Sequence, residues 1–245
     1  MAEEKKAKLR PVFENFETAL KTWWKNLIKF ARLYLWGLVF TLAPILAFGL
    51  ILGLGLLAGL EESLPFMIIG GFLGFWAVIL AIYFAIRVYL AMFILIKKEY
   101  VGKELDIYKE SAKYFWSYIA IVSLTTILML LWFLALVIPA IIFSVFYCFT
   151  IYAFVFENKR DFDAVKRSQE LVKGYWWAIF GRFLLLGLVA WLFMVIIAIP
   201  LSFAPANSLF AAILGIVIQI VSYLIGPIYM LFTYQMYQDL VKIKK

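Results

Sequence analysis

Residues 183–238 read FLLLGLVAWLFMVIIAIPLSFAPANSLFAAILGIVIQIVSYLIGPIYMLFTYQMYQ, a run of 56 positions without Asp, Glu, Lys or Arg. A helix needs about 20 apolar residues to cross the hydrocarbon layer of a bilayer. The run is therefore long enough for two crossings. The turn-forming residues around Pro200 and Pro205 indicate where the chain reverses.

Three further uncharged runs precede this one. They cover residues 33–60, 63–86 and 114–156, and Pro139 interrupts the last of them. Together the runs predict six spans, at about 33–59, 65–95, 115–138, 140–156, 178–200 and 208–237. The fourth span is the shortest.

The composition agrees with a chain that is covered by lipid. Hydrophobic residues make up 66% of the 245 positions and charged residues 16%, against about 45–50% and about 25% in ordinary soluble domains. We therefore expect a single all-α membrane domain over residues 1–245, built as a polytopic helical bundle.

The basic residues indicate the orientation of the chain. None of the 23 Lys and Arg residues lies in the three predicted turns between paired spans. The positive-inside rule then places the turns outside and both termini in the cytoplasm, which predicts a multi-pass protein of the cell membrane. The net charge of +8 favours anionic lipid headgroups as partners. Nucleic acid is a poor partner, because the basic residues flank the spans and are mixed with acidic ones.

The sequence also shows an internal similarity among three segments, at about 9–98, 99–158 and 159–245. Each predicted repeat has a charged amphipathic helix, an outgoing span and a returning span. An acid precedes a hydroxyl by five residues in all three, and the pairs are Glu17 and Thr22, Asp106 and Ser111, and Asp163 and Ser168. We interpret this as three hairpin repeats, each preceded by a cytoplasmic amphipathic helix.

The first amphipathic helix has the clearest pattern. Its apolar face comprises Leu9, Phe13, Phe16, Leu20, Trp23, Leu27 and Phe30. Such helices lie on the membrane or against the spans. Lipid sensing or partner docking is the functional interpretation, and simple anchoring is the alternative.

Acids stand at the end of each predicted returning span. Glu99, Glu157 and Asp239 lie at helix C-termini, where the macrodipole disfavours negative charge. We expect each to form a structural ion pair with a Lys or Arg of an amphipathic helix. A solvated, unpaired acid is the alternative.

The residues that usually carry catalysis are scarce. The chain has no histidine and one cysteine, Cys148, and no predicted span contains a deep carboxylate. This composition predicts no metal site, no cofactor and no enzymatic activity.

Arg87 is the ionisable residue that lies well inside an apolar stretch, ten residues before Lys97. An intramembrane charge is a functional candidate by default. We take Arg87 as a candidate ligand-binding residue, with Tyr89 as a neighbouring hydroxyl and Gln219 as a polar residue that could line a cavity. The alternative is that Arg87 extends to the headgroups or makes a structural hydrogen bond.

Residues 154–177, FVFENKRDFDAVKRSQELVKGYWW, carry the one family resemblance. The stretch resembles polytopic proteins related to the membrane domain of glycerophosphoryl diester phosphodiesterases. The matching positions are Glu157, Ala164, Ser168 and Gly174. The resemblance implies a six-helix membrane domain. In those enzymes a separate soluble domain performs the hydrolysis, and this chain departs from them because it leaves no residues for one.

Two functions remain open. The first is a non-catalytic membrane module that interacts at the cytoplasmic face with lipid headgroups or with a membrane partner, either another protein or a second copy of the chain. The alternative is a transporter or channel for a lipid or a small anionic solute, which would need a continuous polar path.

Overall fold

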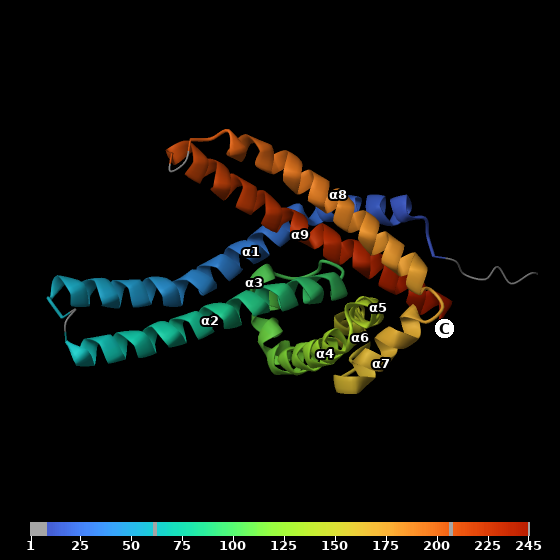
Figure 1. Cartoon of the computed structure of the whole chain (residues 1–245), viewed down its shortest axis with the longest axis horizontal. Helices are drawn as coiled ribbons and strands as arrows, with labels where there is room; N and C mark the ends of the chain where they lie inside the picture. The colour runs from blue at the N-terminus through green and yellow to red at the C-terminus, as the bar shows by residue number, and fades with distance from the viewer. Residues whose placement is uncertain (1–8, 61–62, 206–207, 245) are drawn as a thin grey trace, which may run out of the picture. The chain divides into compact units, whose positions relative to one another are not determined.

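The computed structural model describes residues 9–60, 63–205 and 208–244, and these residues form helices without a strand. The expected all-α fold is therefore confirmed for them. Figure 1 shows the helices, which are α1 (Val12–Leu57), α2 (Leu64–Lys97), α3 (Glu104–Glu110), the 3₁₀ helix η1 (Ser111–Tyr114), α4 (Phe115–Ala135), α5 (Val137–Tyr147), α6 (Thr150–Glu157), α7 (Asp161–Val172), α8 (Trp176–Ser202) and α9 (Leu209–Ile243).

Six helical stretches of the described chain are long and apolar enough to cross a membrane. They are Val12–Leu57, Leu64–Lys97, Glu104–Leu134, Val137–Glu157, Trp176–Leu201 and Leu209–Ile243. Each contains one of the six predicted spans or most of it. The number of candidate spans is thus as predicted.

The helix boundaries differ from the prediction in two places. The amphipathic helix and the first span form one helix, α1, because no Gly or Pro interrupts the chain between Val12 and Trp36. The turn expected at Pro139 lies at Leu136, whose backbone is extended, and Pro139 falls in the first turn of α5. A proline is tolerated there, because the amide groups of the first turn have no partner within the helix.

The chain divides into two compact units, residues 1–27 with 117–245 and residues 28–116. The divisions fall inside α1 and α4, whereas the predicted repeats meet near residues 98 and 158. The threefold repeat therefore stays a prediction.

The unit of residues 28–116 is built around α1 and α2, which run side by side (Figure 1). A Cβ atom added at Gly37 would meet the Val88 side chain at 2.0 Å, so the two helices touch closely there. Farther along, their side chains line an apolar groove of about 430 Å³ that includes Phe48 and Gly71. The short helices α3 and η1 pack against α2.

In the other unit α8 and α9 lie against each other, and α7 packs against α5, α6 and α9. The packed face of α7 is buried and consists of Ala164, Val165, Ser168, Leu171 and Val172. This helix therefore lies against the spans, which is one of the two placements expected for an amphipathic helix.

Candidate functional site

Arg87 is 8% exposed, and it directs its guanidinium group at the last turn of α3. Nη2 donates to the carbonyls of Tyr108 (2.7 Å) and Lys109 (3.3 Å), and Nε donates to the hydroxyl of Ser111 (3.2 Å). The carbonyls at a helix C-terminus carry partial negative charge, so a cation there is stabilising. The guanidinium also lies over the rings of Tyr108 and Tyr83. Arg87 thus clamps α3 onto α2.

Tyr89 and Gln219 occupy more open positions. Tyr89 is 42% exposed on α2, with its ring edge-on to Phe93. Gln219 is exposed on α9 and belongs to the other unit. A ligand site that uses these two residues with Arg87 stays a prediction.

Glu157 lies at the end of α6 and joins three helices. Its carboxylate accepts two hydrogen bonds from Nε of Arg167 on α7, at 2.8 and 3.1 Å. It also accepts one from the hydroxyl of Tyr237 on α9, at 2.7 Å. About a fifth of each side chain of the Arg167–Glu157 ion pair is exposed. The pair is therefore partly shielded from water, where charged hydrogen bonds are stronger than at the surface.

Asp239, on α9, holds the segment that precedes α1. Its Oδ1 atom accepts from Nε of Arg10 at 2.8 Å, and Oδ2 accepts from the backbone N–H of Arg10 and from the amide of Asn15. Nη2 of Arg10 donates in addition to the side chain of Gln235, at 2.8 Å. The Asp239 side chain is 6% exposed. This buried carboxylate thus has partners on both oxygens.

Glu99 differs from the other two acids. It lies beyond the end of α2, in a left-handed conformation with φ of 50°, and forms no ion pair with another described residue. The adjacent Lys98 pairs with Glu110 instead. Glu99 is exposed, so water solvates its carboxylate, which is the alternative to the predicted ion pair.

The four residues of the family resemblance have clear local roles. Ala164 and Ser168 are fully buried on α7. The Ser168 hydroxyl donates to the carbonyl of Phe146 (2.6 Å) and accepts from the N–H of Phe149 (3.1 Å), where the backbone between α5 and α6 is not helical. Gly174 has φ of 88° in the turn from α7 to α8, a conformation that favours glycine. Glu157 is the acid described above.

Arg182 is a buried charge that the sequence analysis did not single out. It lies on α8, is 8% exposed, and donates from Nη2 to the carbonyl of Arg10 at 2.7 Å. Its Nη1 atom is buried without a hydrogen-bond partner, as is Oδ1 of Asn15. The sequence contained a signal for this buried charge, because Arg182 lies inside an apolar stretch, as Arg87 does in another part of the chain.

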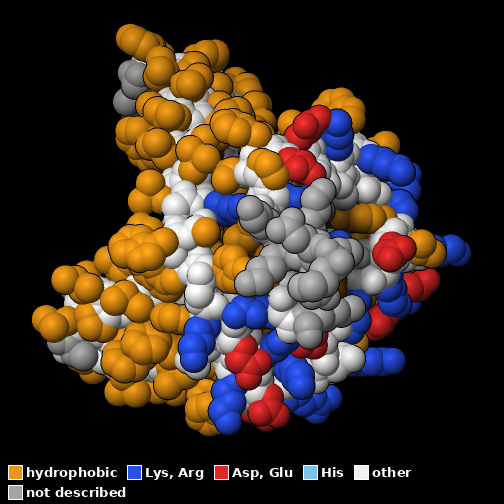
Figure 2. All heavy atoms as spheres, turned by 90° about the vertical axis from the view of Figure 1, so that its right-hand side faces the viewer, with side chains coloured by type: hydrophobic (Ala, Val, Ile, Leu, Met, Phe, Trp, Pro, Cys, Tyr) orange, Lys and Arg blue, Asp and Glu red, His pale blue; other side chains and the backbone are white. Residues whose placement is uncertain are grey.

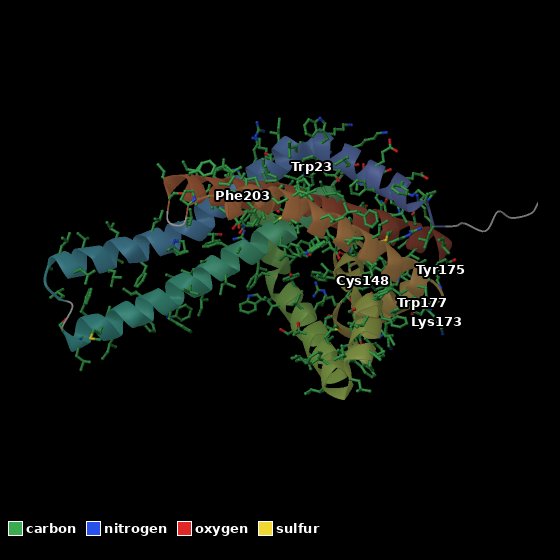
Figure 3. The ribbon with its side chains drawn as sticks, turned by 45° about the horizontal axis from the view of Figure 1, so that its top comes forward. Trp23, Cys148, Lys173, Tyr175, Trp177 and Phe203 are labelled. Carbon is green, nitrogen blue, oxygen red and sulfur yellow. The ribbon has the colours of Figure 1, made fainter. Side chains whose placement is uncertain are left out.

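The first half of α1 buries polar as well as apolar residues and leaves several apolar side chains exposed. Asn15, Ala19 and Asn26 are buried, whereas Phe13 is 81% and Trp24 is 70% exposed. Trp23, labelled in Figure 3, donates its indole N–H to the carbonyl of Leu224 on α9 at 2.7 Å. Polar contacts with α9 thus turn the more polar face inward and leave apolar side chains outside.

Aromatic and basic side chains also gather at the turn from α7 to α8. Figure 3 shows Lys173, Tyr175 and Trp177 there, and Trp177 is 78% exposed. The ammonium group of Lys244 lies 5.7 Å from the centre of the Tyr175 ring and donates to the carbonyl of Lys173. Exposed Trp residues next to Lys are typical of a membrane–water boundary.

Charged and hydrophobic side chains segregate on the surface. In Figure 2, Lys, Arg, Asp and Glu crowd into one region and hydrophobic side chains cover others. The described residues include no group of three or more His, Cys, Asp or Glu that could hold a metal ion. The six long apolar helices of the described chain define the class, which is an α-helical protein with six candidate membrane spans.

Comparison with protein families places the chain more closely. Residues 111–240 match the family described as "Domain of unknown function (DUF7847)". The match covers more than half of the chain, and the protein therefore belongs to this family. No curated protein and no solved structure matches the chain.

Proposed function

We propose that the protein is a membrane module that contacts anionic lipid headgroups through the first half of α1, at the cytoplasmic face of the cell membrane. The observation that carries this proposal is an exposed amphipathic surface on residues 12–27. It consists of Phe13, Leu20 and Trp24, with Lys21 and Lys25 beside them, and we call it the α1 stripe.

The spacing of the stripe supports contact with a membrane interface. Phe13, Leu20 and Trp24 are seven and four residues apart, which places them on one side of a helix. Exposed rings of this size are unfavourable in water, and they bury well among lipid headgroups and upper acyl chains. The two lysines flank the apolar side chains, where they can reach headgroup phosphates.

Lys25 gives the stripe a basic side chain that is available to a headgroup phosphate. Glu17 forms an ion pair with Lys21, and this lysine lowers the pKa of the Glu17 carboxyl group. Lys25 forms no ion pair with a described residue. Each basic residue near an anionic membrane surface contributes about 1 kcal/mol of attraction. Glu14 and Glu17 balance the two lysines within residues 12–27, so the preference for anionic over zwitterionic headgroups is inferred from the net charge of +8 of the whole chain.

The depth of the stripe can be measured with spin labels on single cysteines in a Cys148→Ser background. Leu20→Cys reports the apolar side and Glu14→Cys, on the charged side of the same helix, is the matched control. The measurement uses vesicles of phosphatidylglycerol and phosphatidylcholine. We expect the label at position 20 to be more accessible to oxygen than the label at position 14, and the label at position 14 to be more accessible to a water-soluble nickel chelate. Equal accessibility of both labels to nickel would contradict the proposal.

Lipid preference gives a second measurement. Lys21→Gln combined with Lys25→Gln should lower the ratio of phosphatidylglycerol to phosphatidylcholine retained on purification from mixed vesicles. An unchanged ratio would show that these lysines do not select the lipid.

A further inference from the structure

A buried polar cluster lies where the segment before α1 meets α8 and α9. It consists of Arg10, Asn15, Arg182, Gln235 and Asp239, all in the unit of residues 1–27 and 117–245. Among the residues that the structure describes, the Asp239 carboxylate is the acidic group that offsets the two guanidinium groups. The cluster therefore carries one excess positive charge.

The excess charge resides on Arg182. Both oxygens of Asp239 already accept hydrogen bonds from Arg10 or Asn15. Arg182 donates to a single carbonyl, that of Arg10, and its Nη1 atom is buried without a partner. An unpaired donor on a buried charged group is strongly unfavourable. A bound anion would remove this penalty.

Oδ1 of Asn15 is the second unpartnered atom of the cluster, and it requires a hydrogen-bond donor. Oδ1 of Asn15 is buried and accepts no hydrogen bond, although Asn15 is 0% exposed. The neighbouring Asp239 carboxylate fixes the orientation of the amide, since only the NH₂ group can donate to it. A ligand that satisfies the cluster must therefore accept from Arg182 and donate to Asn15.

We propose that Arg182 and Asn15, with Arg10 at the rim, bind an anionic phosphate ligand that also carries a hydroxyl, either on the phosphorus or on the group esterified to it. A phosphate anion meets this requirement, and so does the headgroup of phosphatidylglycerol. Guanidinium groups match phosphate geometry well. The Arg10 side chain is 29% exposed, so the cluster reaches the surface. The site goes beyond the proposed function, because the α1 stripe can contact lipid without it.

The test uses the full-length protein, stripped of lipid in a nonionic detergent. Its thermal unfolding midpoint is measured against inorganic phosphate at constant ionic strength, and against phosphatidylglycerol or phosphatidylcholine added to the micelles. We expect phosphate, phosphatidylglycerol or both to raise the midpoint in a saturable way. A response to phosphatidylglycerol alone identifies a lipid headgroup, and a response to phosphate alone identifies a soluble ligand.

Two variants locate the site. Arg182→Gln removes the unpartnered donor and should raise the half-saturating concentration by about tenfold or more. Asn15→Asp keeps the side-chain shape but places a negative charge at the site, with the same expected effect, and it carries the test if Arg182→Gln does not fold. Lys166→Gln, on the exposed face of α7, removes one positive charge elsewhere and should leave the response unchanged.

The proposal fails if neither ligand shifts the wild-type midpoint, because a buried water molecule is then a sufficient partner. It also fails if Asn15→Asp responds like the wild type. A Leu20→Ser and Trp24→Ser double variant separates the two proposals. This double variant should lose the membrane contact of the α1 stripe but keep the phosphate response.

Discussion

At the scale of single residues, three partly or fully buried arginines have specific protein partners. Arg87 bonds to the end of α3, Arg167 to Glu157, and Arg10 to Asp239. The Arg87 and Arg167 contacts each join two helices, and the Arg10 contact joins the segment before α1 to α9. Such charge-assisted hydrogen bonds are stronger than bonds between neutral groups. Arg87 and Arg167 thus help to attach the short helices α3 and α7 to their neighbours.

Replacement of Glu157 by Gln should destabilise the protein. The variant loses the charge that holds Arg167 and Tyr237, at a cost of about 2 kcal/mol. Glu170→Gln is the matched control, since Glu170 contacts the same Arg167 at 3.7 Å but is 66% exposed. We expect a loss of at most about 0.5 kcal/mol for the control. The unfolding midpoint in detergent tests both, and equal midpoints would exclude a stabilising role for the Glu157 pair.

Replacement of Arg87 by Gln should loosen α3. The carbonyls of Tyr108 and Lys109 lose their cationic partner in this variant. Its free energy of unfolding should therefore be lower than that of the wild type by about 2–4 kcal/mol. Hydrogen exchange should accelerate over residues 104–114. In the control Arg32→Gln, the lost arginine is 63% exposed and lies 3.8 Å from Glu104, so exchange should change little. Unchanged exchange in Arg87→Gln would contradict the clamping role.

At the scale of elements, hydroxyl groups determine how the helices join. Ser168 bridges the non-helical link between α5 and α6, and Ser111 accepts from Arg87. The third hydroxyl of the predicted repeat, Thr22, donates to the carbonyl of Thr18 on its own helix. Two of the three proposed equivalent positions thus contact a preceding helix, and the third does not.

Replacement of Ser168 by Ala should weaken the junction between α5 and α6. The buried N–H of Phe149 would lose its acceptor, which costs about 1–3 kcal/mol. Ser144→Ala is the control, because Ser144 is exposed and its hydroxyl donates to a carbonyl of its own helix. The difference in unfolding midpoint between the two variants measures the effect. A midpoint for Ser168→Ala as high as that of the control would contradict it.

At the scale of the whole molecule, the distribution of charge predicts the orientation of the chain. The 23 basic residues avoid the predicted outer turns, and this asymmetry usually sets the topology of a membrane protein. The N-terminus, the C-terminus and the segments 97–114 and 157–177 are therefore proposed to be cytoplasmic.

The orientation can be tested by labelling cysteines in intact cells. In a Cys148→Ser background, Lys103→Cys and Lys166→Cys should resist an impermeant thiol reagent until the membrane is opened. A cysteine at Ser63, in the first predicted outer turn, is the matched position and should react at once. Immediate labelling at position 103 or 166 would reverse the proposed topology.

The resemblance over residues 154–177 lies within the part of the chain that matches its family. Its relation to the membrane domain of glycerophosphoryl diester phosphodiesterases stays a prediction. The structure gives each of the four resembling residues a physical role in packing or turning the chain, and these roles involve no hydrolytic chemistry.

The sequence alone determined the helical class and the number of candidate spans. Both follow from the length of uncharged runs, which is a local property: a run of 20 or more apolar residues must satisfy its own backbone in a membrane and does so as a helix. The helix dipole is also local, and it motivated the ion pair between Glu157 and Arg167 of α7, but Glu99 forms no such pair among the described residues.

The tertiary structure alone decided which face of α1 is buried and which charges meet. Periodicity left open whether the apolar face of this helix lies on the membrane or against the spans. The Asn15 amide and the Trp23 indole bond to α9, and Phe13 and Trp24 are exposed. Arg10 and Asp239 are 229 residues apart along the chain. Contacts between residues so far apart in the sequence depend on how the helices pack. The energy of a buried charge depends on all the groups around it, and a local sequence pattern does not contain this information.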